Sequence, residues 1–168
     1  MQLNETSALE RLAVLGMDDM PVIEYTPKQS KLDPDWFKKY SVLRREFLSS
    51  LSDSMEEIAF MNLSQDEFIN LVMGNSLPEN LSIRFRIPLL WGGELKIENL
   101  FLCSTFPHSN NLDRFIIEQS DAKTVYLPNP NKKIYVTTHT GGGGAGGNAA
   151  SDRLSQTAFH FASGRGNE

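Results

Sequence analysis

The pattern of apolar and polar positions predicts helices in the first half of the chain. Apolar residues recur every three or four positions in residues 5–15, 33–51 and 64–74, which is the spacing of an amphipathic helix. Residues 54–61 are expected to form one more short helix. The stretch between the first two helices contains several prolines and is expected to be irregular.

Residue types that favour helix starts support these assignments. Thr6 or Ser7 is expected to cap the first helix, and Asp33 the second. Ser64 and Glu67 have the spacing of a capping box, in which each side chain bonds to the backbone N–H of the other. The helix predicted within residues 64–74 is therefore expected to start at residue 65.

The period of the pattern changes after residue 80. Ile83, Phe85 and Ile87 alternate with polar residues, as expected for a strand with one buried face. A glycine pair then predicts a turn, and residues 100–104 predict an apolar partner strand. These features indicate a β-hairpin.

A helix and two more strands are expected beyond the hairpin. Leu112, Phe115 and Ile116 have helical spacing, and their helix is expected to lie across the hairpin as the last element of a ββα unit. Residues 123–140 predict two short strands around a Pro-Asn-Pro-Asn turn.

These elements predict an α+β fold in three parts. N-terminal helices occupy residues 1–63, a ββα domain occupies 64–138, and a Gly-rich linker with a short C-terminal helix occupies 139–168. The glycine run at 141–147 is expected to be a flexible linker rather than a phosphate-binding loop, because the Lys-Ser/Thr ending of a P-loop is missing.

Composition narrows the class of protein. The chain has 168 residues and is 40% apolar and 22% charged, and no apolar run approaches the roughly 20 residues that span a membrane. We expect a soluble protein with no membrane contact and no signal peptide. Cys103 is the only cysteine, so it is expected to be a small core residue.

The net charge of −5 argues against a protein that coats nucleic acid. Residues 1–80 carry 7 basic and 14 acidic side chains, whereas residues 81–140 carry 7 and 5. Arg84 and Arg86 share one face of the predicted strand, and Lys96 extends it. This patch is expected either to bind phosphate or an acidic partner, or simply to face solvent.

Three pairs around the hairpin carry a resemblance. Pro88-Leu89, Gly92-Gly93 and Asn99-Leu100 match in type and spacing the frame of the HNH endonucleases, especially the nuclease domains of colicin-type and related bacterial toxins. The resemblance covers about residues 64–136. It implies a ββα fold and an origin in conflict between bacterial cells.

The same resemblance implies a site that this chain lacks in part. One histidine of a family His-His pair activates water, and the other holds a single divalent metal with histidines of the following helix. The pair falls on Arg84 and Phe85, which can neither accept a proton at neutral pH nor bind a metal. His108 matches the first helical histidine, and Asp113, or Leu112, matches the later one.

Each matching residue also has a structural interpretation. Asn99 is either a catalytic brace or a turn residue at a strand start. His108 is either a ligand or an exposed loop histidine, and Asp113 is either a ligand or a carboxylate that complements the helix dipole. His139 precedes the glycine run and is a further candidate ligand, whereas His160 has no match.

We therefore expect a catalytically degenerate HNH-like protein, without a cofactor, that acts by binding. Its expected partner is a protein of a bacterial toxin or effector system, in preference to nucleic acid, and its expected location is the bacterial cytoplasm or the end of a specialised secretion route. The alternative is an active endonuclease in which Asn99 and His108 are catalytic and His108, Asp113 and His139 hold one divalent metal. A third interpretation is an unrelated α+β module, and the oligomeric state stays open.

Overall fold

The computed structural model describes residues 2–17, 20–59, 61–129 and 133–135, and its fold is mixed α+β as predicted. The helices are α1 (Glu5–Val14), α2 (Trp36–Ser50), α3 (Met55–Ala59), α4 (Gln65–Val72) and α5 (Asn110–Ile117). The strands are β1 (Val22–Tyr25), β2 (Leu81–Phe85), β3 (Leu100–Ser104), β4 (Val125–Pro128) and β5 (Ile134–Tyr135). Single helical turns at Leu51–Asp53, Leu89–Trp91, Ile97–Asn99 and Thr105–Ser109 connect them.

The strands form two small sheets. One has the order β2-β3-β5, with β2 and β3 antiparallel and β3 and β5 parallel; the other pairs β1 with β4 antiparallel. In the first sheet Arg84 lies opposite Phe101, and Phe85 lies opposite Leu100. The predicted hairpin is therefore confirmed, with a 14-residue connection, residues 86–99, between its strands.

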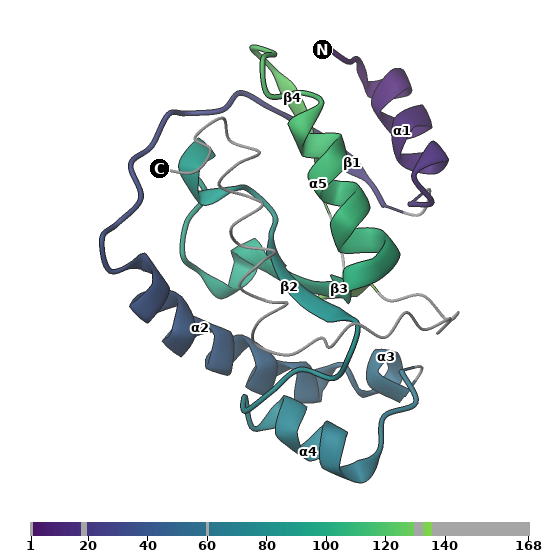
Figure 1. Ribbon diagram of the computed structural model, residues 1–168, viewed down its shortest axis with the longest axis vertical. Coiled ribbons are helices and arrows are strands. Elements are labelled where there is room, and N and C mark those ends of the chain that lie inside the picture. The colour runs from purple at the N-terminus through teal and green to yellow at the C-terminus, as the bar shows by residue number, and fades with distance from the viewer. Residues whose placement is uncertain (1, 18–19, 60, 130–132, 136–168) are drawn as a thin grey trace.

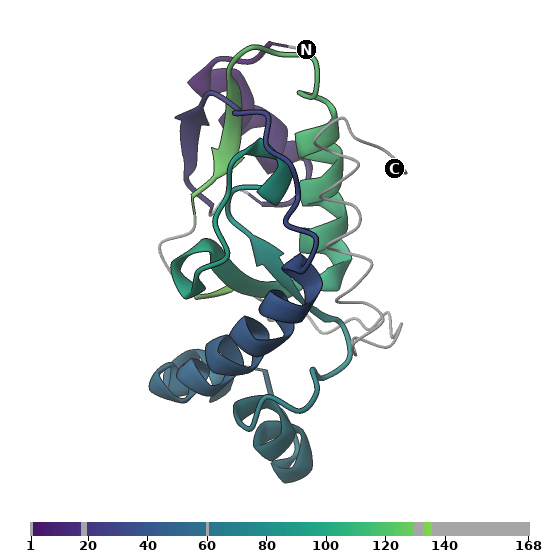
Figure 2. The same cartoon turned by 90° about the vertical axis from the view of Figure 1, so that its left-hand side faces the viewer.

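Helices cover both faces of this hairpin. Phe85, Leu100 and Leu102 pack in one apolar cluster with Tyr40 and Phe47 of α2. The opposite face packs in a second cluster, where residues of β3, α5 and α1 meet: Phe101, Cys103, Leu112, Phe115, Ala8 and Leu12. Figures 1 and 2 both show β2 and β3 between α5 on one side and α2 on the other.

The N-terminal segment is held against the second half of the chain. The predicted first helix is confirmed, but its cap is Asn4 rather than Thr6 or Ser7: the Asn4 side chain accepts a hydrogen bond from the Ser7 N–H (2.8 Å). Arg11 of α1 donates two hydrogen bonds to the carboxylate of Glu118, just after α5. Helices α1 and α5 are thus joined by charge as well as by apolar contact.

The middle helices agree with the prediction in type and nearly in bounds. Helix α2 begins at Trp36, slightly later than expected. The capping box of α4 is confirmed, since Ser64 accepts from the Glu67 N–H (3.1 Å) and Glu67 accepts from the Ser64 N–H (2.9 Å). Local sequence rules account for this part of the fold.

Strand β1 was not predicted, and the partners of β4 and β5 were not specified. The segment 16–34 was expected to be irregular, but its residues Val22–Tyr25 form β1 because β4 supplies a partner. The two strands predicted within residues 123–140 exist, yet they belong to different sheets rather than to each other. The glycine run, the predicted C-terminal helix, His139 and His160 lie outside the described residues.

Over the part of the chain that the structure describes, none of the helices has the length and apolarity that crossing a membrane requires.

Candidate functional site

Strand β2 is buried on both faces, and this corrects the prediction of a half-buried strand. All five of its residues are buried, and the exposed fraction of Arg84 is 0%. The polar face carries Ser82 and Arg84, and it is covered because the turn Thr105–Ser109 packs there and Asp113 of α5 reaches Arg84. Alternation in the sequence therefore separates two interior faces instead of an inner and an outer one.

The buried guanidinium of Arg84 binds to groups at the start of α5. Its Nη1 donates hydrogen bonds to the carbonyl oxygen of Ser109 (3.0 Å) and to the Ser109 hydroxyl (2.8 Å). The same nitrogen lies 2.6 Å from Oδ1 of Asp113, one turn further along the helix. We call Arg84, Ser109 and Asp113 the ion-pair centre.

Burial governs the electrostatics of this centre. It raises the pKa of the Asp113 carboxyl, and the positive charge and hydrogen bond of Arg84 offset that rise only in part. Burial also raises the pKa of the neighbouring Cys103 thiol to about 12. Cys103 is fully buried and stays a neutral thiol at physiological pH, so it is the core residue that the sequence predicts and not a nucleophile.

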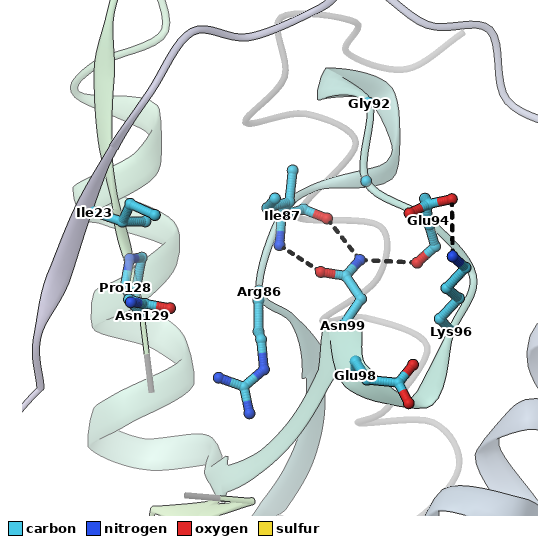
Figure 3. A pocket seen from close by; sticks show the side chains of 11 residues that line it. Ile23, Arg86, Ile87, Gly92, Glu94, Lys96, Glu98, Asn99, Pro128 and Asn129 are labelled. Carbon is cyan, nitrogen blue, oxygen red and sulfur yellow. Dashed lines mark hydrogen bonds and ion pairs between the residues drawn. The ribbon is translucent and has the colours of Figure 1, made fainter. Parts of the chain in front are cut away.

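Asn99 braces the connection between β2 and β3, residues 86–99, which we call the hairpin loop. Its side-chain amide donates to the carbonyl oxygens of Ile87 (3.1 Å) and Glu94 (2.9 Å) and accepts from the Ile87 N–H (2.9 Å). Figure 3 shows these three bonds crossing the loop. Asn99 thus holds the loop directly before β3, and every polar atom of its amide has a backbone partner.

The glycine pair is required by the same loop. Gly92 has φ +102°, a left-handed conformation that residues with a Cβ rarely adopt. A Cβ at Gly93 would lie 2.0 Å from the carbonyl oxygen of Ile87. From outside, the Tyr25 hydroxyl donates a hydrogen bond to the carbonyl oxygen of Trp91 (2.6 Å). The hairpin loop is therefore held by the side chain of Asn99 within it and by the Tyr25 hydroxyl from another segment.

A surface pocket of about 260 Å³ lies between the hairpin loop and the β1-β4 sheet. Figure 3 shows Ile23 and Pro128 on one side, opposite Arg86 and Ile87 at the start of the hairpin loop. The later loop residues Glu94, Lys96 and Asn99 lie beyond Ile87. Its lining consists of Ile23, Arg86, Ile87, Gly92, Gly93, Glu94, Lys96, Glu98, Asn99, Pro128 and Asn129. We call it the loop pocket.

Two cations line the loop pocket in different ways. The guanidinium of Arg86 lies over the ring of Phe101, 5.9 Å from its centroid, and partial burial lowers the pKa of Arg86. Arginine stays protonated despite such a shift. Lys96 is mainly exposed, and its Nζ lies 3.3 Å from a carboxylate oxygen of Glu94. The pocket is therefore lined by one partly buried cation and one exposed ion pair.

The structure separates residues that the sequence groups together. Of the predicted cationic patch, Arg86 and Lys96 reach the loop pocket, whereas Arg84 lies in the interior. Of the candidate ligands, Asp113 binds Arg84, and His108 is buried, which corrects the expectation of an exposed loop histidine. Within residues 2–17, 20–59, 61–129 and 133–135, no group of three or more His, Cys, Asp or Glu side chains is placed to hold a metal ion.

Sequence reasoning missed the ion pair and the loop pocket. One signal for the ion pair was available, because an Arg and an Asp occupy two positions that the resemblance brings together in space. No signal pointed to the pocket, since its walls come from three separate segments. Comparisons with models of known families, with curated proteins and with solved structures find no match.

Proposed function

We propose that this chain is a catalytically inactive HNH-like protein that acts by binding a protein partner, in a bacterial toxin or effector system. The observation that carries the proposal is the ion-pair centre. Arg84 occupies a position where the resemblance implies a histidine, and Asp113 occupies the position of a later ligand. The two side chains bind each other.

Charge explains why this centre is unsuited to a divalent cation. The guanidinium of Arg84 is permanently positive and repels a second cation at the same place. It also engages the carboxylate of Asp113, the anionic residue among the candidate ligands. Metal binding would have to displace a fully buried arginine, at a large cost in desolvation and lost hydrogen bonds.

The second position of the implied histidine pair is equally changed. The side chain of Phe85 points away from the ion-pair centre into the apolar cluster that includes Tyr40 of α2. Its ring meets the Tyr40 ring edge-on at 5.7 Å between centroids. Phenylalanine has no lone pair for a proton. Phe85 can therefore not act as the general base.

The hairpin loop, which lies within the stretch that carries the resemblance, is braced in detail, and this supports a binding role for it. The Asn99 side chain hydrogen-bonds to the backbone on both sides of the hairpin loop, at Ile87 and Glu94. The missing Cβ of Gly93 lets its backbone lie close to the Ile87 carbonyl. Such a loop fixes the shape of the surface that it forms. A rigid surface is suited to recognition, because binding to it orders little of the chain.

Calorimetry combined with a cleavage assay tests the proposal. Zn²⁺, Mg²⁺, Mn²⁺ and Ni²⁺ are titrated into the full chain and into His108→Ala, and plasmid DNA and structured RNA are incubated with each metal. We expect no binding that the variant loses and no cleavage. Micromolar binding that disappears in His108→Ala, together with metal-dependent cleavage, would favour the competing nuclease built on His108, Asp113 and His139.

A further inference from the structure

We propose that the side of β1 that faces away from β4, which we call the β1 edge, binds an extended segment of a protein partner. The segment adds to the β1-β4 sheet as a third, antiparallel strand and alternates basic with aliphatic residues. This inference rests on the proposed function for the existence of a protein partner. It adds the place of contact and the chemistry of the partner segment.

The backbone of β1 points hydrogen-bonding groups away from β4 at two residues. In an antiparallel pair, residues that bond to the partner strand alternate with residues whose backbone groups face outward. The Asn129 N–H donates to the carbonyl oxygen of Pro21 (2.7 Å), and the register then places the next bonds to β4 at Ile23. The N–H and C=O groups of Val22 and Glu24 therefore face outward.

The opposite edge of this sheet, at β4, is closed by a side chain. Tyr126 lies opposite Glu24, so its backbone groups also point out of the strand pair. The side-chain amide of Gln119 accepts from the Tyr126 N–H (2.7 Å) and donates to the Tyr126 carbonyl oxygen (2.9 Å). Gln119 is fully buried, and it satisfies this edge as a neighbouring strand would.

The β1 edge has no comparable cover among the residues that the structure describes. Within those residues the sheet consists of β1 and β4, and Figure 2 shows β1 as the outer strand, at the left. Ile23 and Glu24 are exposed, and no backbone hydrogen bond joins Val22 or Glu24 to a described residue outside the sheet. An open strand edge is a template for another chain, and extended peptides commonly bind in this way.

Two prolines limit the length of what binds. Pro21 lies directly before β1, and Pro27 follows it with one residue between. Proline has no N–H to donate to an added strand. The β1 edge therefore suits one short segment, as long as the four residues of β1. It does not suit the continuous strand pairing of an aggregate.

Uncompensated negative charge lies on one face of this strand pair. Burial raises the pKa of Tyr126, and the charges of Glu24 and Glu5 raise it further, so both carboxylates lie near its hydroxyl. Neither glutamate has an ion-pair partner among the described residues. A lysine or arginine of the segment, placed opposite Glu24, gains a cross-strand charge pair.

The other face favours an aliphatic residue. Ile23 has an exposed fraction of 46% and lines the loop pocket with Ile87 and Pro128. A segment residue opposite Ile23 forms a pair without hydrogen bonds, in which the two side chains lie closest. Because side chains alternate along a strand, segment residues whose N–H faces β1 carry side chains on the Glu24 face, and the residues between them meet Ile23.

NMR of the full, metal-free chain tests this inference. The probe is the acetylated and amidated pentapeptide Lys-Ile-Lys-Ile-Lys. One control peptide carries N-methyl groups on its second and third lysines, whose N–H groups would face β1. The matched control carries N-methyl groups on its two isoleucines, whose N–H groups would face solvent. A further peptide has glutamate in place of lysine.

We expect the outward amides of Val22 and Glu24 in the free chain to exchange with solvent faster than the amide of Ile23, which faces β4. The pentapeptide should cause saturable shifts that are largest at Val22 and Glu24. N-methylation of the lysines should weaken binding about tenfold or more, because it removes donors to β1. N-methylation of the isoleucines should leave binding nearly unchanged.

Charge variants test the preference for a basic segment. Glu24→Lys should weaken binding of the pentapeptide about threefold or more, and it should favour the glutamate peptide instead. The control is Glu56→Lys, which makes the same change at an exposed position of α3 and should leave binding unchanged. Backbone spectra of each variant establish that it is folded.

Several results would overturn the inference. Slow exchange of the two outward amides in the free chain would show that the β1 edge is already covered. Shifts at these amides that depend on protein concentration without peptide would assign the edge to a second copy of the chain. Equal binding of the two N-methylated peptides, equal effects of Glu24→Lys and Glu56→Lys, or no saturable shift would also contradict it.

This test is separate from that of the proposed function. Because no metal is present, failure here leaves the metal and cleavage results untouched. Conversely, a metal-dependent nuclease can still bind the pentapeptide at the β1 edge.

Discussion

Arg84, in β2, and Arg86, just past the end of β2, are two residues apart, yet they occupy different environments. Arg84 is fully buried beneath α5 and bound to Ser109 and Asp113. Arg86 lies past the end of the strand, over Phe101, at a surface pocket. The position of the covering segment, rather than the strand pattern, determines which guanidinium is fully buried.

This difference separates structural from functional charge. A buried pair that is well hydrogen-bonded contributes little net stability over an apolar pair, but removing one partner leaves an uncompensated charge in the interior. A half-exposed guanidinium keeps access to water and tolerates change. Variants at the two positions should therefore differ sharply in stability.

The largest expected effect follows removal of the buried arginine. Arg84→Met strands the carboxylate of Asp113, so the free energy of unfolding should fall by about 3 to 5 kcal/mol. Urea denaturation at neutral pH measures the change. The matched control is Arg86→Met, for which we expect a loss of less than about 1 kcal/mol. Similar losses at the two positions would contradict the contrast.

An intermediate effect is expected when the loop brace is removed. Asn99→Ala eliminates three hydrogen bonds, two to the backbone of Ile87 and one to the backbone of Glu94, which are part-buried. The free energy of unfolding should fall by about 2 kcal/mol.

Asn129→Ala, an exposed pocket residue, is the control for the brace and should leave stability unchanged. Urea denaturation of both variants measures the difference. An Asn99→Ala protein as stable as wild type would show that the loop does not depend on its brace.

The smallest expected effect concerns the link between α1 and α5. Hydrogen bonds and charge from Arg11 hold the pKa of Glu118 below its ordinary value. Since the folded-state pKa is the lower one, the stability is present above the unfolded pKa, about 4.3. It is lost as the pH falls through the folded value.

Glu118→Gln should therefore cost about 0.5 to 1 kcal/mol at pH 7, and the difference from wild type should shrink steadily below about pH 4. Thermal or urea unfolding across this range measures it, with the exposed Glu10 as Glu10→Gln control. A cost that stayed constant with falling pH would mean that packing, and not charge, joins the two helices.

Much of the secondary structure follows from local sequence. The capping box of Ser64 and Glu67, the apolar period of α2 and the strand 100–104 all depend on neighbouring residues, and each was predicted with nearly correct bounds. The wrong cap of α1 has the same origin, because Asn4 and Ser7 both suit a helix start and only the path of the backbone decides between them.

The remaining features depend on contacts between distant segments. Strand β1 exists because β4 lies beside it, and Arg84 is interior because α5 covers it. The loop pocket needs Ile23, Arg86 and Pro128 to converge from separate elements. None of these contacts leaves a periodic trace in the sequence, so the pattern alone predicts an exposed Arg84 and no pocket.

The most direct test of the ion-pair centre is a double-mutant cycle on Arg84 and Asp113. Urea denaturation is compared for wild type, Arg84→Met, Asp113→Leu and the double variant. We predict a coupling energy of at least about 2 kcal/mol, with the double variant more stable than either single variant because it strands no charge. Losses that simply add would mean that the two side chains do not depend on each other and would contradict the ion-pair centre.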